Sequence, residues 1–492
     1  MRIAVVATLL FAFLVNAPSA SAQMSFGART QIWYFMWKDG GALQSSSDTA
    51  ERMKSRVSEL NLDKYAELGA TWNIVDVWQQ IDGPDGFRRL ARVIEEHERR
   101  GIQVALRLLE DPEIYAQLSK SNDSATILSE YEKWVSAVAK RFGKRVRYYL
   151  VSNEVDHDVG YNVPIYKKSY VVRYDDYEKV LAAAYRAIKA VDKGLLVLDH
   201  GTSSYSLCLA VASAYAETGR VDQAIAFLRG MRNGGTSGWA DSAKAVYALR
   251  RPENARRIEF AKATMRRAGR YSDVLQFHHY FGPDVLPQVI QWIRGEMVAS
   301  GGERPIVTTE LGYRILSKKG QAWNGRAANI ADVGQYSETE HAADIVKNIT
   351  ILGAMGARDV LYWQIRFHNN RSPTMTLYAS TEKAESFAPF KAAKAWAFAA
   401  RQFSDAQEIM RVNHPDNNSL VEYRAAGSKK FSVLWAANGS MPLPKDWSPR
   451  IKRVLDIEGR DITSNIREGW TIGEAPLHVE WLSEKITQDG RR

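Results

Sequence analysis

The chain has 492 residues, of which 45% are hydrophobic and 25% are charged, and its formal net charge at pH 7 is +10. These proportions are typical of globular proteins and argue against a largely disordered chain, and the length allows one large domain and a smaller one. Lys and Arg are scattered rather than clustered, which argues against a nucleic-acid-binding protein. The positive charge therefore indicates either solubility alone or an anionic partner.

The first 22 residues have the layout of a secretory signal peptide. Arg2 precedes an apolar run over residues 3–15, and the small residues Ala20-Ser21-Ala22 follow. We expect cleavage after Ala22, which removes one Arg, lowers the net charge from +10 to +9 and makes the protein secreted or periplasmic. A retained anchor helix is the alternative, but the run is short for a bilayer span of about 20 residues. No later stretch predicts a membrane span.

A single cysteine, Cys208, excludes an intramolecular disulfide. It lies in the apolar, helical stretch SLCLAVASAYA, without an evident base beside it. We therefore expect a buried structural thiol rather than a catalytic one.

Eight short apolar runs rich in β-branched and aromatic residues predict eight strands. They are QIWYFMW (31–37), TWNIVDVWQ (71–79), QVALRLL (103–109), RYYLVSNEV (147–155), LLVLDHG (195–201), DVLQFHHY (273–280), PIVTTELG (305–312) and VLYWQI (360–365).

Helical patterns stand between these strands. Residues 87–102 and 127–143 carry apolar side chains at spacings of three and four, and residues 337–357 begin with a capping box of Ser337 and Glu340. Alternating strands and helices, eight times over, predict an α/β protein, a (β/α)₈ TIM barrel. An open doubly wound sheet is the main alternative, but the residues after the first predicted strand, WKDGG, are not its Gly-rich phosphate loop.

The predicted domains are a signal peptide (1–22), a barrel (23–403) and a small C-terminal β-sandwich-like domain (404–492). Within the barrel, residues 202–272 form an insertion, where Gly219 separates two amphipathic helices in the manner of a helical hairpin. After residue 403 short alternating stretches predict β-strands. This β-domain either packs against the barrel or binds carbohydrate, and we favour packing because no aromatic platform is evident.

Two glutamates end predicted strands on the side where such barrels hold their chemistry. Glu154 follows the fourth strand in VSNEVD, and Glu310 lies at the end of the seventh in VTTELG. Strands four and seven lie on roughly opposite sides of the mouth, so inward side chains can meet over one bond. Two carboxylates about 5 to 5.5 Å apart suit a retaining glycosidase, with one as acid/base and one as nucleophile.

Polar and aromatic residues at the same strand ends complete the candidate site. Tyr280 ends strand six, where its hydroxyl can donate to Glu310, and His278 points to the same side of that strand. Asn153 can bond a sugar hydroxyl, and Trp363 offers an aromatic face for a sugar ring.

Three further residues are candidates with an equally plain structural alternative. Trp37 and Trp78 end strands one and two, where they can extend the aromatic floor or belong to the core. Arg107, near the end of strand three, either orients a substrate or glutamate or forms a structural ion pair. We include all three in the predicted substrate-binding set.

This pattern resembles clan A of the glycoside hydrolases. The resemblance lies in VSNEVD, in the His-x-Tyr of HHY, in VTTELG and in the strand-eight LYWQ, and it covers residues 31–400. It implies that Glu154 is the acid/base and Glu310 the nucleophile, assisted by the residues Asn153, His278, Tyr280 and Trp363. The barrel followed by a β-domain looks most like family 39 and related bacterial enzymes acting on β-xylosides or exopolysaccharides, from which the 202–272 insertion departs.

The resemblance implies a retaining β-glycoside hydrolase that acts on a polysaccharide or oligosaccharide, with no metal and no organic cofactor. The excess positive charge suggests an anionic polysaccharide. A transglycosylase that uses the same two glutamates, and a barrel that binds carbohydrate without catalysis, remain the alternatives.

Overall fold

The structure is a computed structural model that describes residues 23–29, 62–79, 84–121, 123–159, 170–230, 242–312, 338–365, 377–378, 389–465 and 470–482. The predicted signal peptide, Ser337 and Trp37 lie outside these ranges. Among the helices described, none is both long enough and apolar enough to cross a bilayer.

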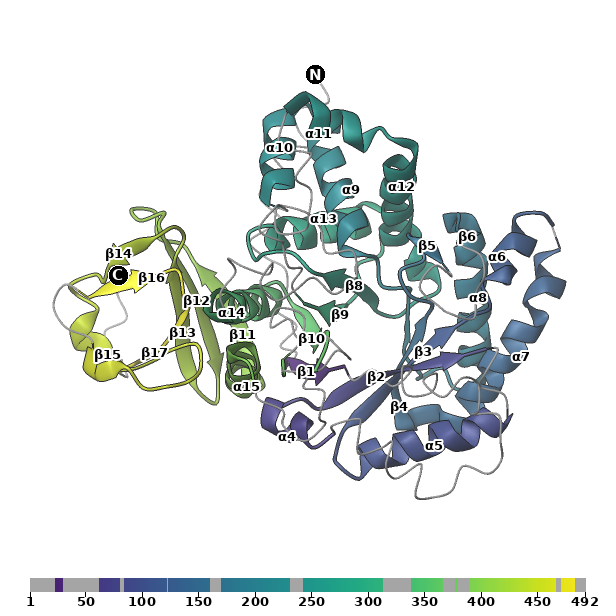
Figure 1. Ribbon diagram of the computed structural model, residues 1–492, viewed down its shortest axis with the longest axis horizontal. Helices are drawn as coiled ribbons and strands as arrows, with labels where there is room; N and C mark the ends of the chain where they lie inside the picture. Colours follow the sequence, from purple (N-terminus) through teal and green to yellow (C-terminus); the bar gives the residue numbers. More distant parts are fainter. Residues whose placement is uncertain are drawn as a thin grey trace, which may run out of the picture.

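Eight parallel strands form the barrel, in the order β7-β4-β3-β2-β1-β10-β9-β8 (Figure 1). Bridges between Leu198 and Val274 and between Thr202 and Phe277 join the two outermost strands. The predicted (β/α)₈ fold is therefore confirmed. The strands are β1 (Ser25–Ala28), β2 (Trp72–Trp78), β3 (Gln103–Leu109), β4 (Val146–Val151), β7 (Val197–Leu198), β8 (Leu275–His279), β9 (Ile306–Leu311) and β10 (Ala357–Tyr362).

The first strand is not the predicted one. We expected residues 31–37, which lie outside the described residues, whereas β1 is Ser25–Ala28 and pairs with both β10 and β2. The sequence SFGA is short and made mostly of small residues, so it lacks the apolar signal of the other strands. Small size is needed here, because a Cβ at Gly27 would lie 2.6 Å from the Trp72 indole.

A layer of apolar side chains fills the inside of the barrel. The inward residues alternate along each strand, as Trp72 and Ile74 do on β2, and Asp76 follows on the same face. Each large side chain buried in this way contributes roughly 1.5 to 3 kcal/mol. The buried layer comprises Trp72, Ile74, Ala105, Tyr148, Leu150, Leu198, Val274, Val307 and Leu361.

Helices surround the barrel, and the three that we predicted are present with their ends shifted by a few residues. Asp123 caps α7 by accepting a hydrogen bond from the backbone N–H of Thr126. The surrounding helices are α4 (Lys64–Leu68), α5 (Pro84–Glu98), α6 (Glu113–Leu118), α7 (Ser124–Phe142), α8 (Tyr174–Val191), α12 (Pro252–Arg267), α13 (Leu286–Ala299), α14 (Glu338–Ala354) and α15 (Lys391–Phe403). A short hairpin of β5 (Asp158–Val159) and β6 (Tyr170–Val171) follows β4.

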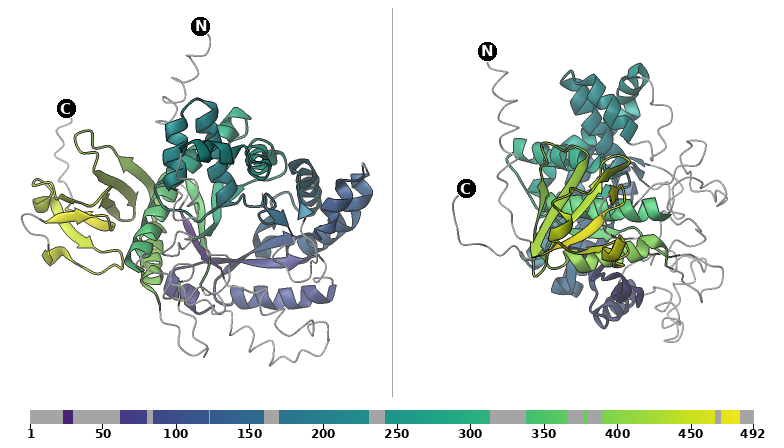
Figure 2. Two further views of the ribbon diagram at one scale, coloured as in Figure 1. Left: turned by 45° about the horizontal axis from the view of Figure 1, so that its top comes forward. Right: turned by 90° about the vertical axis from the view of Figure 1, so that its left-hand side faces the viewer.

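In its described residues, the segment between β7 and β8 is helical. It contains α9 (Ser204–Glu217), α10 (Val221–Gly230) and α11 (Ser242–Leu249), and α12 returns the chain to the barrel (Figures 1 and 2). Gly219, with φ at 77°, separates α9 from α10. Cys208 is buried in α9, and burial raises the pKa of its thiol, which fits the expected structural role.

The C-terminal residues form antiparallel β-structure that packs on the barrel's side (Figure 1). The ring centroids of Phe398, in α15, and His478 lie 4.5 Å apart, and those of Phe403 and Phe431 lie 5.5 Å apart. These contacts support the packing role that we favoured. The strands are β11 (Ala406–Val412), β12 (Leu420–Gly427), β13 (Lys430–Ala436), β15 (Ile451–Leu455) and β17 (Leu477–Trp481), with β14 (Ser440–Pro442) paired to β16 (Thr471–Gly473).

Candidate active site

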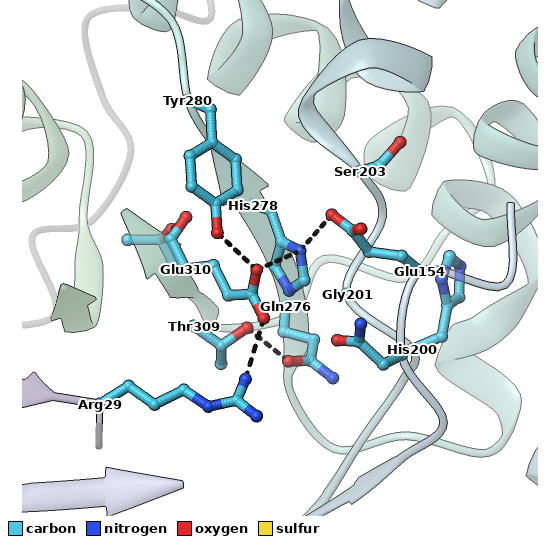
Figure 3. A network of polar contacts seen from close by, with 12 residues as sticks. Arg29, Glu154, His200, Gly201, Ser203, Gln276, His278, Tyr280, Thr309 and Glu310 are labelled. Atoms are coloured by element: carbon cyan, nitrogen blue, oxygen red, sulfur yellow. Dashed lines mark hydrogen bonds and ion pairs between the residues drawn. The ribbon is translucent and has the colours of Figure 1, made fainter. Parts of the chain in front are cut away.

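A cluster of charged side chains lies inside the mouth of the barrel, beyond the apolar layer. Asp76 of β2, Arg107 of β3 and Glu310 of β9 are buried there, and buried Arg29 joins them from the residue after β1. Glu154 follows β4 on the opposite side of the mouth (Figure 3). Strand ends on this face are where (β/α)₈ enzymes hold their chemistry.

The turn that carries Glu154 has an unusual backbone. Ser152 and Glu154 have φ angles of 70° and 46°, in the left-handed region that costs a residue with a Cβ about 1 to 3 kcal/mol. The Ser152 hydroxyl donates to Glu110 Oε2 at 2.7 Å, and the Glu154 N–H donates to the carbonyl of His200 at 2.9 Å. Neighbouring strands therefore hold the turn from both sides and direct the Glu154 carboxylate into the mouth.

The two glutamates predicted to be catalytic meet across His278. Its Nδ1 lies 2.7 Å from Glu154 Oε1 and 3.4 Å from Glu310 Oε2. One carboxylate oxygen of each glutamate and the His278 nitrogen all lie within 4.8 Å of one another. The Glu154 side chain is 29% exposed and that of Glu310 only 5%, so one carboxylate meets solvent and the other does not.

His278 is held tightly between the glutamates. Burial by itself would lower its pKa, but the charges of Glu310 and Glu154 outweigh burial and raise the pKa above its ordinary value. A Cβ at Gly201, whose φ is 67°, would lie 2.5 Å from His278 Nε2, so this position needs glycine. His279, the next residue, points to the other side of β8, where burial lowers its pKa to about 4.

Among the described residues, four side chains hydrogen-bond or ion-pair with Glu310. Its Oε1 accepts from Arg107 Nη1 at 2.9 Å and from Arg29 Nη1 at 3.1 Å. The Tyr280 hydroxyl donates to Oε2 at 2.6 Å, and His278 completes the set. Burial and then the Glu310 charge raise the Tyr280 pKa well above its ordinary value, so Tyr280 stays a donor. Together these groups fix the position of the Glu310 carboxylate.

Asp76 links the two arginines beneath Glu310. It accepts from Arg29 Nη2 at 2.6 Å and from Arg107 Nε at 2.7 Å. Burial would raise the Asp76 pKa, but the two guanidinium groups outweigh burial and leave it below its usual value. Two arginines and two carboxylates thus balance in charge, which lets the cluster exist away from water.

The remaining predicted residues lie around this cluster. Asn153 Oδ1 accepts from Arg107, so its amide nitrogen is the group left for a substrate hydroxyl. The Arg29 guanidinium lies 3.9 Å over the Trp363 ring, so a sugar would have to use the other face of that ring. Trp78 ends β2 two residues past Asp76, on the same inward side.

Two residues of the cluster were not in the predicted site. Asp76 had a signal, since an acid in the middle of the apolar run NIVDVW needs a buried partner. Arg29 had none, because it follows the strand that we did not recognise.

Glu154, His278 and Glu310 are also a set that could hold a metal ion by their atom types and spacing. However, the guanidinium groups of Arg29 and Arg107 both bond Glu310 Oε1, and they would repel a cation placed there. The two arginines therefore argue against a metal ion bound at Glu310.

The chain was compared with known proteins. No family model and no curated protein matches it. A conserved exported protein from Bacteroides fragilis has a TM-score of 0.55 at 11% identity, over 94% of this chain and 97% of that one. A family 39 glycoside hydrolase from Bacteroides cellulosilyticus WH2 has a TM-score of 0.52 at 11% identity, over 95% of this chain and 82% of that one. At such identities the likeness shows a shared fold.

Proposed function

We propose that this chain is a secreted glycoside hydrolase that cleaves a β-linked polysaccharide or oligosaccharide with retention of configuration. The observation that carries the proposal is the separation of at most 4.8 Å between carboxylate oxygens of Glu154 and Glu310 at the barrel mouth. Retaining glycosidases hold their two carboxyl groups about 5 to 5.5 Å apart, whereas inverting enzymes leave about 6.5 to 9.5 Å for a water molecule. The fold shared with a family 39 glycoside hydrolase is consistent with this activity.

The surroundings of each glutamate support its role. Glu310 is buried and accepts hydrogen bonds from two arginines and a tyrosine, which hold its carboxylate in place for attack. Glu154 lies at the solvent edge, where a leaving group can depart and water can enter. The first step is attack of Glu310 on the anomeric carbon, while Glu154 gives its proton to the leaving oxygen.

The second step reverses these roles. Glu154, now ionised, takes a proton from water, whose oxygen attacks the anomeric carbon and releases Glu310. Each displacement inverts that carbon, so the product keeps the β configuration. His278 and Tyr280 position the two carboxylates, and Arg29 and Arg107 regain their ion pairs when Glu310 is released.

The experiment that tests the proposal is hydrolysis of a panel of 4-nitrophenyl β-glycosides, with the released sugar followed by ¹H NMR. We expect the β-anomer first, with the α-anomer appearing only by mutarotation, and no turnover in Glu310→Gln. Products longer than the substrate would instead favour a transglycosylase. The α-anomer first, or no hydrolysis of any glycoside, would contradict the proposal.

A further inference from the structure

The side of the mouth beyond Glu154 receives the leaving group if Glu154 protonates the leaving oxygen, so the role assigned to that side rests on the proposed function. There the helical insertion meets the turn that carries Glu154. The Ser203 hydroxyl, at the start of α9, donates to Asp156 Oδ2 at 2.6 Å, and in Figure 3 Ser203 lies above Glu154, whereas Glu310 lies to its left. The insertion therefore borders the space that a leaving group would occupy.

Two consecutive arginines of α12 reach this border. Arg256 Nη1 lies 3.5 Å from the carbonyl oxygen of Asp156, which is two residues after Glu154. Two residues of chain span at most about 7 Å, so Arg256 contacts the backbone of the turn that carries Glu154.

The neighbouring Arg257 has hydrogen-bonding capacity left over. Its guanidinium group lies 5.3 Å from the ring centroid of Tyr205, in the first turn of α9. Its Nε is buried and has no hydrogen-bond partner in the described part of the chain, and no carboxylate described there pairs with it. A guanidinium group without a carboxylate partner is available to an anionic ligand.

Other cations of α12 differ from Arg257 because they have carboxylate partners. Between residues 250 and 270 there are eight Lys or Arg and only two Glu. Farther along the helix the cations have carboxylate partners from other helices: Lys262 pairs with Glu217, and Arg266 pairs with Glu296. Arg257, by contrast, has no such partner among the described residues.

We propose that Arg256, Arg257 and the ring of Tyr205 form a subsite for an anionic sugar on the leaving-group side of the scissile bond. Guanidinium groups match the planar, two-oxygen geometry of carboxylates and related anions, and such charge-assisted bonds are about twice as strong as neutral ones. A carboxylate of a uronic acid and a sulfate ester share this chemistry. The substrate class is then an acidic polysaccharide, with its charge next to the bond that is cut.

The test uses full-length Glu310→Gln, which cannot turn the ligand over, and calorimetry at low and high salt. The ligands are hexasaccharides of β-1,4- and β-1,3-glucan, each in a neutral form, a form oxidised at C6 to the uronate, and a form sulfated at C6. We expect at least about tenfold tighter binding of a charged form than of its neutral counterpart, with the preference weakened by salt. The better of the two charged forms identifies the anionic group.

Substitution locates the subsite. Adding Arg256→Gln or Arg257→Gln should reduce the preference for the charged form by about tenfold. Arg266→Gln, on the same helix and paired with Glu296, should leave the preference unchanged. Equal affinities for neutral and charged forms, undetectable binding included, or a preference that survives removal of both arginines, would overturn the inference.

The two proposals can fail separately. Hydrolysis of aryl glycosides by the wild type without any preference for charged ligands would leave the glycosidase in place and remove the subsite. A preference that depends on Arg256 and Arg257, in a wild type that hydrolyses nothing, would keep the anion site and remove the glycosidase.

Discussion

Two clusters of ion-paired side chains lie among the described residues of the barrel, one at each end, and the one at the strand starts is only partly buried. At the start of the strands, Asp359 of β10 pairs with Arg147 of β4 at 2.8 Å and accepts from the Tyr148 hydroxyl. At the strand ends, Asp76 pairs in the same way with Arg29 and Arg107. The apolar layer around Trp72 and Ile74 separates the two.

The two clusters differ in whether their arginines can bond a further carboxylate. At the strand starts one arginine, Arg147, pairs with one carboxylate, Asp359. The Arg147 guanidinium carbon also lies 5.9 Å from the centroid of the Trp72 ring, so its contacts are with other residues at that end of the barrel. At the strand ends the pairs with Asp76 leave both arginines able to bond a second carboxylate, Glu310. The same chemistry stabilises the fold at one end and holds a charged carboxylate opposite Glu154 at the other.

The largest expected effect is that of Glu310→Gln. It removes the nucleophile and should lower kcat/KM by about 10⁴-fold or more, measured on whichever aryl β-glycoside the wild type cleaves best. The matched change at the other end, Asp359→Asn, should leave kcat/KM within about threefold, because it acts on the fold alone. Similar losses in both variants would erase the distinction between the two ends.

Next in size is Glu154→Ala, which should lower kcat/KM by about 10² to 10⁴-fold because the leaving oxygen is no longer protonated. The rate of the first step should fall less for substrates with a good leaving group, which need no protonation. Added azide should restore turnover and give a β-glycosyl azide. An α-glycosyl azide would mean that no covalent intermediate forms.

Asp76→Asn should cost about 3 to 5 kcal/mol of unfolding free energy, since it leaves Arg29 and Arg107 buried with too little negative charge. Urea unfolding at neutral pH measures this. Asp359→Asn should also destabilise the protein, but only Asp76→Asn should lower kcat, because its arginines also hold Glu310. An Asp76→Asn variant with wild-type kcat would contradict the role of the strand-end cluster.

The smallest expected effect is a pH dependence of stability through His278. Its folded pKa is raised above the ordinary value of 6.5, by Glu310 and Glu154 against the effect of burial. Its contribution is therefore complete below the ordinary pKa and is lost as the pH rises through the folded pKa. The difference in unfolding free energy between wild type and His278→Gln should be larger at about pH 5.5 than at about pH 9. A difference that grows with pH would contradict this.

Seven of the eight strands could be located from the sequence, because each is a run of buried apolar residues, and Glu154 and Glu310 stood out because each lies at the end of such a run. The first strand, SFGA, could not be found, since its small residues make room for Trp72 instead of forming an apolar run. Arg29 was missed with it.

The geometry at the mouth of the barrel could not be predicted from the sequence, for a different reason. Asp76 is visible as an acid within an apolar strand, but its two arginines come from β3 and from the residue after β1, which only the closed barrel brings together. The left-handed backbone of Ser152 and Glu154 is imposed by contacts with Glu110 and His200, which are distant in sequence. Neither Ser nor Glu favours a left-handed backbone, so the sequence gives no sign of this conformation.

The most direct test of the central claim is intact-protein mass spectrometry after incubation with a panel of 2-deoxy-2-fluoro β-glycosyl fluorides. These reagents form the glycosyl-enzyme quickly and release it slowly. We expect one fluoroglycosyl adduct on the wild type, mapped by peptide analysis to Glu310, and none on Glu310→Gln. An adduct on another residue, or hydrolysis of β-glycosides with no adduct from any sugar, would contradict the assignment of Glu310 as the nucleophile.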